Sequence, residues 1–128
     1  MTRKIINALA VFVLLTATLS ANAQEYTSGV SYVNDYEQAV EIEGKKILVV
    51  FGAEWCRYCQ VLKNEIDMLQ VDEYIVCLVD VDQRPDLKKK YLFKTLPTSV
   101  VLFNRKEIAR KSGYTRQDYG GWLEKHKK

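Results

Sequence analysis

Two cysteines separated by two residues are the part of this sequence best suited to do chemistry. Cys56 and Cys59 lie in the stretch WCRYCQ, which follows the apolar run ILVVF and the residues GAE. Two thiols at this spacing can form a reversible disulfide, supply half of the ligands of a metal site, or form a disulfide that only stabilises the fold. The surrounding residues favour the first of these uses.

A metal site would need more ligands than the chain offers. A closed zinc site takes four ligands, and besides the pair there are only Cys77, inside an apolar run, and one histidine, His126, near the C-terminus. Covalent haem attachment is excluded because Gln60, and not histidine, follows Cys59. A disulfide that closes so short a loop also removes little entropy from the unfolded chain. Redox chemistry is therefore favoured, with a zinc or copper protein and a non-catalytic binding module as alternatives.

The pair lies where a buried strand is expected to turn into a helix. The first sulfur would then sit at the helix N-terminus, where free backbone N–H groups and the helix dipole stabilise a thiolate. Cys56 is the predicted nucleophile, and Cys59, within disulfide reach, is the predicted resolving thiol. Three neighbours would tune the pair: Arg57 by favouring the thiolate, Glu54 by opposing it, and Tyr58 by its place between the cysteines.

Strands and helices alternate around this pair. Apolar runs at 47–51, 74–81 and 98–103 predict buried strands, and a polar turn at 104–107 leads to an antiparallel edge strand at 108–111. Helices are predicted at 36–42 (capped by Asn34 or Asp35 and ended by Gly44), from Cys59 to 69, at 85–91, and at 116–125, where Thr115 and Asp118 resemble a capping box. This order predicts an α/β fold with a central mixed sheet and helices on both faces.

The N-terminal residues have the pattern of a secretory signal peptide. Arg3 and Lys4 precede an apolar stretch from Ile5 to Leu19, and Ala21-Asn22-Ala23 provides a cleavage site. We therefore divide the chain into a cleaved signal peptide (1–23), a lead-in (24–33) and one domain (34–128), with a periplasmic or secreted product. Cleavage leaves 17 basic residues against 16 acidic ones, so the charge balance gives no indication of nucleic-acid binding.

Several motifs together resemble the thioredoxin superfamily. They are the strand ILVVF, the turn WCRYC, the strand YIVCLVDVD, the step Leu96-Pro97-Thr98 before the strand TSVVLF, and Gly113 after the hairpin. The chain resembles small exported thioredoxin-like proteins and the thioredoxin-like domains of periplasmic electron-relay proteins. The resemblance implies a thioredoxin-like fold, a cis peptide bond at Pro97, and substrate contacts from Trp55, Leu96 and Pro97.

Two positions depart from the family pattern. Arg57-Tyr58 replaces the Gly-Pro that is typical between the cysteines of thioredoxins, and Val50 replaces the buried acid expected six residues before the first cysteine. The usual proton acceptor for the resolving thiol is thus missing. Glu54 could take its place through water or could be an ordinary surface acid.

The function implied by the resemblance is thiol–disulfide exchange with exported proteins. No bound cofactor is expected, because the dithiol itself carries the electrons. We expect a monomeric reductant or relay component that a membrane electron donor re-reduces, since a periplasm is kept oxidising. Cys77, in an apolar run, is expected to be a buried packing residue.

Overall fold

The computed structural model describes residues 29–69 and 71–128, so the predicted signal peptide and residues 24–28 of the lead-in lie outside the described residues. A five-stranded sheet with the order β1-β3-β2-β4-β5 forms the centre of the molecule. Its strands are β1 (Ser31–Tyr32), β2 (Lys46–Gly52), β3 (Tyr74–Asp80), β4 (Thr98–Phe103) and β5 (Lys106–Ser112). β1, β2 and β3 are parallel, whereas β4 and β5 run antiparallel to their neighbours. The sheet is therefore mixed, as predicted.

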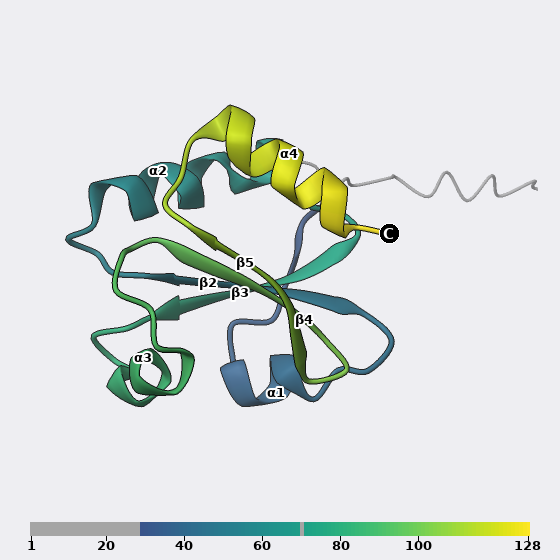
Figure 1. Cartoon of the computed structure of the whole chain (residues 1–128), viewed down its shortest axis with the longest axis horizontal. Helices are drawn as coiled ribbons and strands as arrows, with labels where there is room; N and C mark the ends of the chain where they lie inside the picture. The colour runs from purple at the N-terminus through teal and green to yellow at the C-terminus, as the bar shows by residue number, and fades with distance from the viewer. Residues whose placement is uncertain (1–28, 70) are drawn as a thin grey trace, which may run out of the picture.

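Four α-helices cover the two faces of this sheet. They are α1 (Tyr36–Val40), α2 (Arg57–Glu65), α3 (Pro85–Tyr91) and α4 (Arg116–His126), and a 3₁₀ turn, η1 (Ile66–Met68), follows α2. Figure 1 shows α2 and α4 on one face and α1 and α3 on the other. None of the helices in the described part of the chain is long and apolar enough to cross a membrane.

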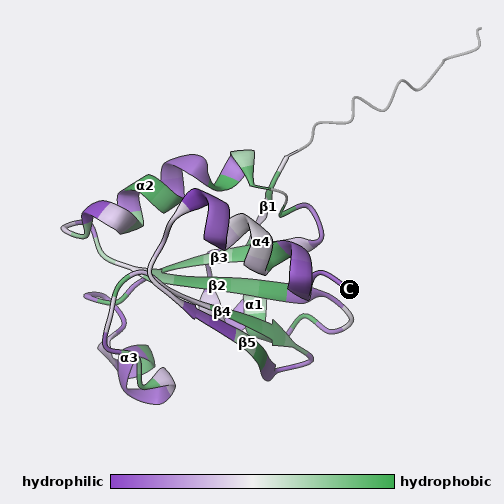
Figure 2. Ribbon diagram, turned by 45° about the horizontal axis from the view of Figure 1, so that its top comes forward, coloured by the Kyte–Doolittle hydropathy of each residue, from purple (hydrophilic) through white to green (hydrophobic). Residues whose placement is uncertain are grey.

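Alternation along β2 divides the core into two layers. Ile47, Val49 and Phe51 belong to the layer under α1 and α3. Leu48 and Val50 belong to the layer under α2 and α4. Because successive strand residues point to opposite faces, a strand that is apolar at every position serves both layers, and the central strands are correspondingly hydrophobic in Figure 2.

The predicted elements differ from the observed ones mainly at their ends. α2 begins at Arg57 and not at Cys59, and α1 ends at Val40, before the predicted end at Ile42. The hairpin turn contains only Asn104 and Arg105, whose φ angles of 47° and 68° let β5 begin already at Lys106. β1 and η1 were not predicted.

The predicted capping box of α4 is wrong. Thr115 occupies the N-cap position with extended backbone angles, but its side chain makes no capping hydrogen bond. The Asp118 carboxylate instead forms an ion pair with Lys111 Nζ at 2.5 Å. Because Lys111 on the neighbouring strand β5 binds the Asp118 carboxylate, this carboxylate does not form the hydrogen bond that the local sequence pattern predicted.

Candidate active site

The cysteine pair forms a disulfide at the N-terminus of α2. Cys56 is the N-cap residue, Cys59 lies in the first turn, and their Cα atoms are 5.2 Å apart. The backbone N–H of Cys59 donates a hydrogen bond to Cys56 Sγ at 3.3 Å. Helix formation therefore directs a free N–H of the first turn at the sulfur that was predicted to be the nucleophile, and such an N–H can stabilise a thiolate when the pair is reduced.

The turn before α2 is held by backbone hydrogen bonds. Ala53, one residue after β2, accepts hydrogen bonds from the Cys56 backbone N–H at 3.1 Å and from Gln60 Nε2 at 3.2 Å. Both cysteines are nearly buried, with 7% and 6% of their surfaces exposed. The disulfide is thus fixed at the carboxyl end of β2.

Gly52, the last residue of β2, is needed for this close packing. A Cβ atom at position 52 would lie 3.1 Å from Cys59 Cβ and 3.3 Å from Cys59 Sγ. The sequence analysis did not single out this glycine, although its place between the buried strand and the cysteine turn is a signal that could have been used.

Trp55 stands beside the pair, with 72% of its surface exposed. Its indole N–H donates a hydrogen bond to Asp82 Oδ2 at 2.8 Å. Asp82 follows β3, whose carboxyl end lies at the same sheet edge as that of β2 because the two strands are parallel. Asp82 is a site residue that sequence reasoning missed.

Leu96 and Pro97 precede β4, and Leu96 lies in the same groove as Cys56. The peptide bond between them is cis, as the family resemblance implied. Pro97 is buried and its carbonyl oxygen accepts a hydrogen bond from the Gly113 N–H at 2.8 Å. Among the described residues, no backbone hydrogen bond uses the N–H or C=O of Leu96, so both groups are free to pair with another chain.

A groove runs along Trp55, Cys56 and Leu96. We call it the client groove, after the protein substrate (the client) that the family resemblance implies. It has a volume of about 540 Å³, and its lining includes Trp55, Cys56, Asp82, Thr95 and Leu96. The structure therefore brings together the predicted nucleophile and two of the three predicted substrate-contact residues.

A separate cavity of about 280 Å³ lies on the Cys59 side of the disulfide. Val50, Glu54, Lys63 and Asp80 line it together with Cys59. Val50 is 5% exposed and pairs in register with Leu78 on β3, so the position expected to hold a buried acid is apolar and has an apolar neighbour. Glu54, which is exposed, is among the charged groups on the same cavity as the resolving thiol.

The two residues between the cysteines are exposed to solvent. Arg57 is exposed, and Tyr58 has 63% of its surface exposed. Neither lines the client groove or the cavity beside Cys59. Their proposed tuning role would therefore act through charge and local backbone and not through direct contact with groove or cavity.

Cys77 lies in the middle of β3 and is fully buried. Burial, followed by the nearby charges of Asp35 and Glu37, raises the pKa of its thiol to about 12. A thiol with this pKa stays protonated and unreactive at neutral pH. Within residues 29–69 and 71–128, no group of three or more histidine, cysteine or acidic side chains could hold a metal ion.

Comparison with known proteins identifies similar chains. The family description Thioredoxin matches residues 28–122. Thioredoxin 2 of Plasmodium falciparum is 31% identical over 91 residues, which cover 68% of this chain and 58% of the relative. Thioredoxin-1 of Drosophila melanogaster is 28% identical over 90 residues, which cover 67% of this chain and 84% of the relative. The chain spans about three fifths of the length of the two Plasmodium relatives that it matches.

Solved structures agree with this result. The X-ray structure of Fasciola hepatica thioredoxin is 29% identical, with a TM-score of 0.65, and the match covers 76% of this chain and 96% of that one. The solution structure of the oxidised thioredoxin from Plasmodium falciparum is 20% identical, with a TM-score of 0.67. The match covers 78% of this chain and 100% of that one. At such low identity the second likeness concerns the fold alone.

Proposed function

The chain belongs to the thioredoxin family, and on this premise we propose that it is a thiol–disulfide oxidoreductase that acts on protein disulfides through Cys56 and Cys59. The observation that supports this most directly is the disulfide at the start of α2, with the Cys59 N–H donating to Cys56 Sγ. A disulfide that only stabilises the fold has no need to lie at a helix N-terminus, whereas a reactive thiolate is stabilised there.

The exchange proceeds in two steps when the pair is reduced. The Cys56 thiolate attacks one sulfur of a client disulfide, which forms a Cys56–client disulfide and releases the other client sulfur as a thiolate. The Cys59 thiolate then attacks Cys56 Sγ, which forms the Cys56–Cys59 bond and releases the second client thiolate. The protein loses two electrons and the client gains them, and the two protons of the dithiol end on the client thiols after exchange with solvent.

The second step needs an acceptor for the Cys59 proton. We assign Glu54 to this task, acting through water, because it lines the cavity beside Cys59, where Val50 provides no carboxylate. Asp80, the other carboxylate on this cavity, already accepts a hydrogen bond from the Asp82 N–H at 2.9 Å. The client itself would be held as an added strand on the free N–H and C=O of Leu96, with Trp55 as the wall of the client groove.

We further propose that the protein works outside the cytoplasm as a monomeric reductant or relay component. The support is the signal-peptide pattern of residues 1–23 and the absence of a histidine between the cysteines. In an oxidising compartment a membrane protein with its own dithiol would have to return the Cys56–Cys59 pair to the reduced form. Mass spectrometry of the exported protein should find an N-terminus at Gln24, and an N-terminus at Met1 would contradict export by cleavage.

The test of the activity is reduction of insulin disulfides with dithiothreitol as the electron source. The wild type is expected to accelerate the reaction, and Cys56→Ser and Cys59→Ser are expected to abolish the acceleration. Cys59→Ser should also accumulate a Cys56–client disulfide, visible as a larger species that a reductant removes. Cys77→Ser, which leaves the pair intact, is the matched control and should keep the activity.

Two results would count against this function. If wild type and Cys56→Ser reduced insulin equally slowly, the pair would not be catalytic. If in addition a double Cys56→Ala/Cys59→Ala variant bound unfolded client chains as tightly as the wild type, the alternative of a non-catalytic client-binding module would replace the proposal.

A further inference from the structure

We propose that the client groove continues into a basic surface beside α3 that selects client disulfides flanked by acidic residues. This inference rests on the proposed function, because the occupant is the client whose disulfide reaches Cys56. The surface, which we call the lysine shelf, is formed by Lys88, Lys89, Leu92, Phe93 and Lys94.

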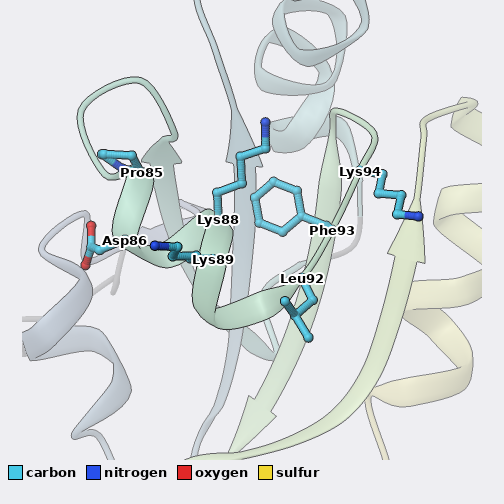
Figure 3. A pocket seen from close by; sticks show the side chains of 7 residues that line it. All are labelled: Pro85, Asp86, Lys88, Lys89, Leu92, Phe93 and Lys94. Carbon is cyan, nitrogen blue, oxygen red and sulfur yellow. The ribbon is translucent and has the colours of Figure 1, made fainter.

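The client groove and the lysine shelf are continuous. The hollow over the shelf has a volume of about 870 Å³ and shares Pro85, Lys88, Phe93 and Lys94 with the client groove. Figure 3 shows the side chains that line it, with Lys88 and Phe93 extending close to each other from α3 and the segment that follows. A chain whose disulfide is at Cys56 can therefore extend over the shelf without a gap.

The charge of the shelf is positive and unbalanced. Lys88, Lys89 and Lys94 are exposed, and among the described residues none of them forms an ion pair. Asp86 also lines the hollow over the shelf, and it pairs with Arg84, with Nη2 and Oδ2 2.9 Å apart. Arg84 also pairs with Glu37, and it lowers the pKa of the Asp86 carboxyl. Asp86 therefore stays ionised with its charge partly offset by Arg84, and the three lysines outnumber it on this surface.

The shelf also contains two apolar side chains, one buried and one exposed. Phe93 is 7% exposed and forms part of the core, whereas Leu92 has 79% of its surface exposed. Leu92 adopts a left-handed conformation (φ 55°) at the C-cap of α3, a position usually taken by glycine or asparagine. A leucine held there in solvent presents an apolar side chain beside the lysines. The chemistry of the shelf thus fits an extended peptide that carries acidic residues and an occasional apolar one.

Acidic side chains of the protein near the disulfide would repel acidic client residues there. Asp82 lines the client groove and accepts the hydrogen bond from Trp55, and Glu54 lies on the other side of the pair. Acidic client residues are therefore favoured over α3, away from Asp82, and not next to the reacting sulfurs.

The test uses two disulfide-linked peptides of equal length that differ only in the residues several positions from the cystine, glutamate in one and lysine in the other. Both are reduced by the purified protein with dithiothreitol as the electron source. We expect kcat/KM for the acidic peptide to be higher by a factor on the order of ten at low salt. The preference should fall to about twofold or less at roughly 0.5 M NaCl, where charges on the surface are screened.

Charge reversal localises the effect. Lys88→Glu/Lys94→Glu should invert the preference, whereas Lys45→Glu/Lys106→Glu makes the same change in net charge and should leave it unchanged. The control lysines are exposed, and they stand before β2 and at the start of β5, at the end of the sheet away from Cys56. Far-UV circular dichroism and urea unfolding show that each variant is folded, so this control does not depend on activity.

The outcomes separate the two proposals. Equal rates for both peptides, or a preference that survives high salt, would overturn the lysine shelf and leave the oxidoreductase function standing. A preference lost equally in the control variant would assign it to net charge and also overturn the shelf. If neither peptide nor insulin is reduced faster than by dithiothreitol alone, the proposed function fails and the inference fails with it.

Discussion

Cys56 and Cys59 are joined by one bond but face different surroundings. Cys56 lines the client groove, whereas Cys59 lines the smaller cavity with Val50 and Glu54. This difference follows from α2, because residues three apart on a helix lie on one side but at different heights. In the proposed mechanism, Cys56 is thereby accessible to the client, and Cys59 lies behind it. The sequence predicted these two roles from the place of Cys56 at a helix start and from the spacing of the pair, but it could not show which cavity each sulfur faces.

At the scale of single residues, Gly52 gives the first prediction. Gly52→Ala should destabilise the oxidised protein by about 1–3 kcal/mol, because the added Cβ would lie 3.1 Å from Cys59 Cβ. Gly121→Ala is the matched control: its Cβ meets nothing within 4 Å in α4, and the better helix propensity of alanine should stabilise the protein by about 0.5–1 kcal/mol. Urea unfolding measures both. A Gly52→Ala protein as stable as the wild type would show that the contact does not constrain the site.

Cys77 gives a second prediction at this scale. Because burial raises the pKa of its thiol to about 12, the thiol is neutral at pH 8 and should not react with iodoacetamide in the folded, oxidised protein. In denaturant the same protein should take up one label, on Cys77. Mass spectrometry counts the labels, and rapid labelling of the folded protein would contradict the role of Cys77 as a packing residue.

At the scale of elements, a hydrogen-bonded cluster fixes the end of α2 against the start of α4. Glu65, the last residue of α2, accepts hydrogen bonds from the Tyr114 hydroxyl and from Arg116 Nη2, the latter at 2.8 Å. No local sequence pattern indicates this cluster, because Tyr114 and Arg116 lie 49 and 51 residues from Glu65 in the chain. Its position ties the helix that carries the cysteines to the C-terminal helix.

This cluster makes stability depend on pH. The hydrogen bond from Tyr114, and then that from Arg116, lowers the pKa of Glu65 below its ordinary value of 4.5. Since the folded pKa lies below the unfolded one, the ionised carboxylate stabilises the folded state above about pH 4.5, and this stabilisation is lost as the pH falls through the folded value. Glu65→Gln should therefore be less stable than the wild type at pH 7, and the gap should narrow at acidic pH.

Urea unfolding of wild type and Glu65→Gln at pH 7 and pH 3 measures this gap. Glu73→Gln removes an exposed carboxylate that has no ion pair among the described residues and serves as the control. A gap that is the same at both pH values would contradict the assignment.

The elements predicted from the sequence match best where one local signal dominates. α3 and β4 have the predicted bounds, because Pro85 marks the start of a helix and the run TSVVLF has no polar interruption. β1 was missed because Ser31 and Tyr32 are exposed and form a strand only through pairing with β3. The contact between Trp55 and Asp82 was missed for the same reason: it depends on which strands are neighbours, and that is a property of the assembled sheet.

At the scale of the whole molecule, the parallel pairing of β2 and β3 determines where chemistry can occur. The carboxyl ends of these strands lead to the cysteine turn and to Asp82, and β4 begins beside them with the cis Leu96–Pro97 bond. Segments far apart in sequence thus meet at one edge of the sheet. The family resemblance could predict this meeting point, whereas residue patterns alone predicted only the elements.

The measurement that tests the central claim most directly is the reduction potential of the Cys56–Cys59 pair. The protein is equilibrated with dithiothreitol or glutathione buffers, and free thiols at the two positions are counted by alkylation and mass spectrometry, with Cys77 as the internal reference. A reductant of the thioredoxin type predicts a potential of about −250 mV or lower. A value of about −120 to −180 mV would contradict the reductant role, and a pair that exchanges with neither buffer would contradict the redox function itself.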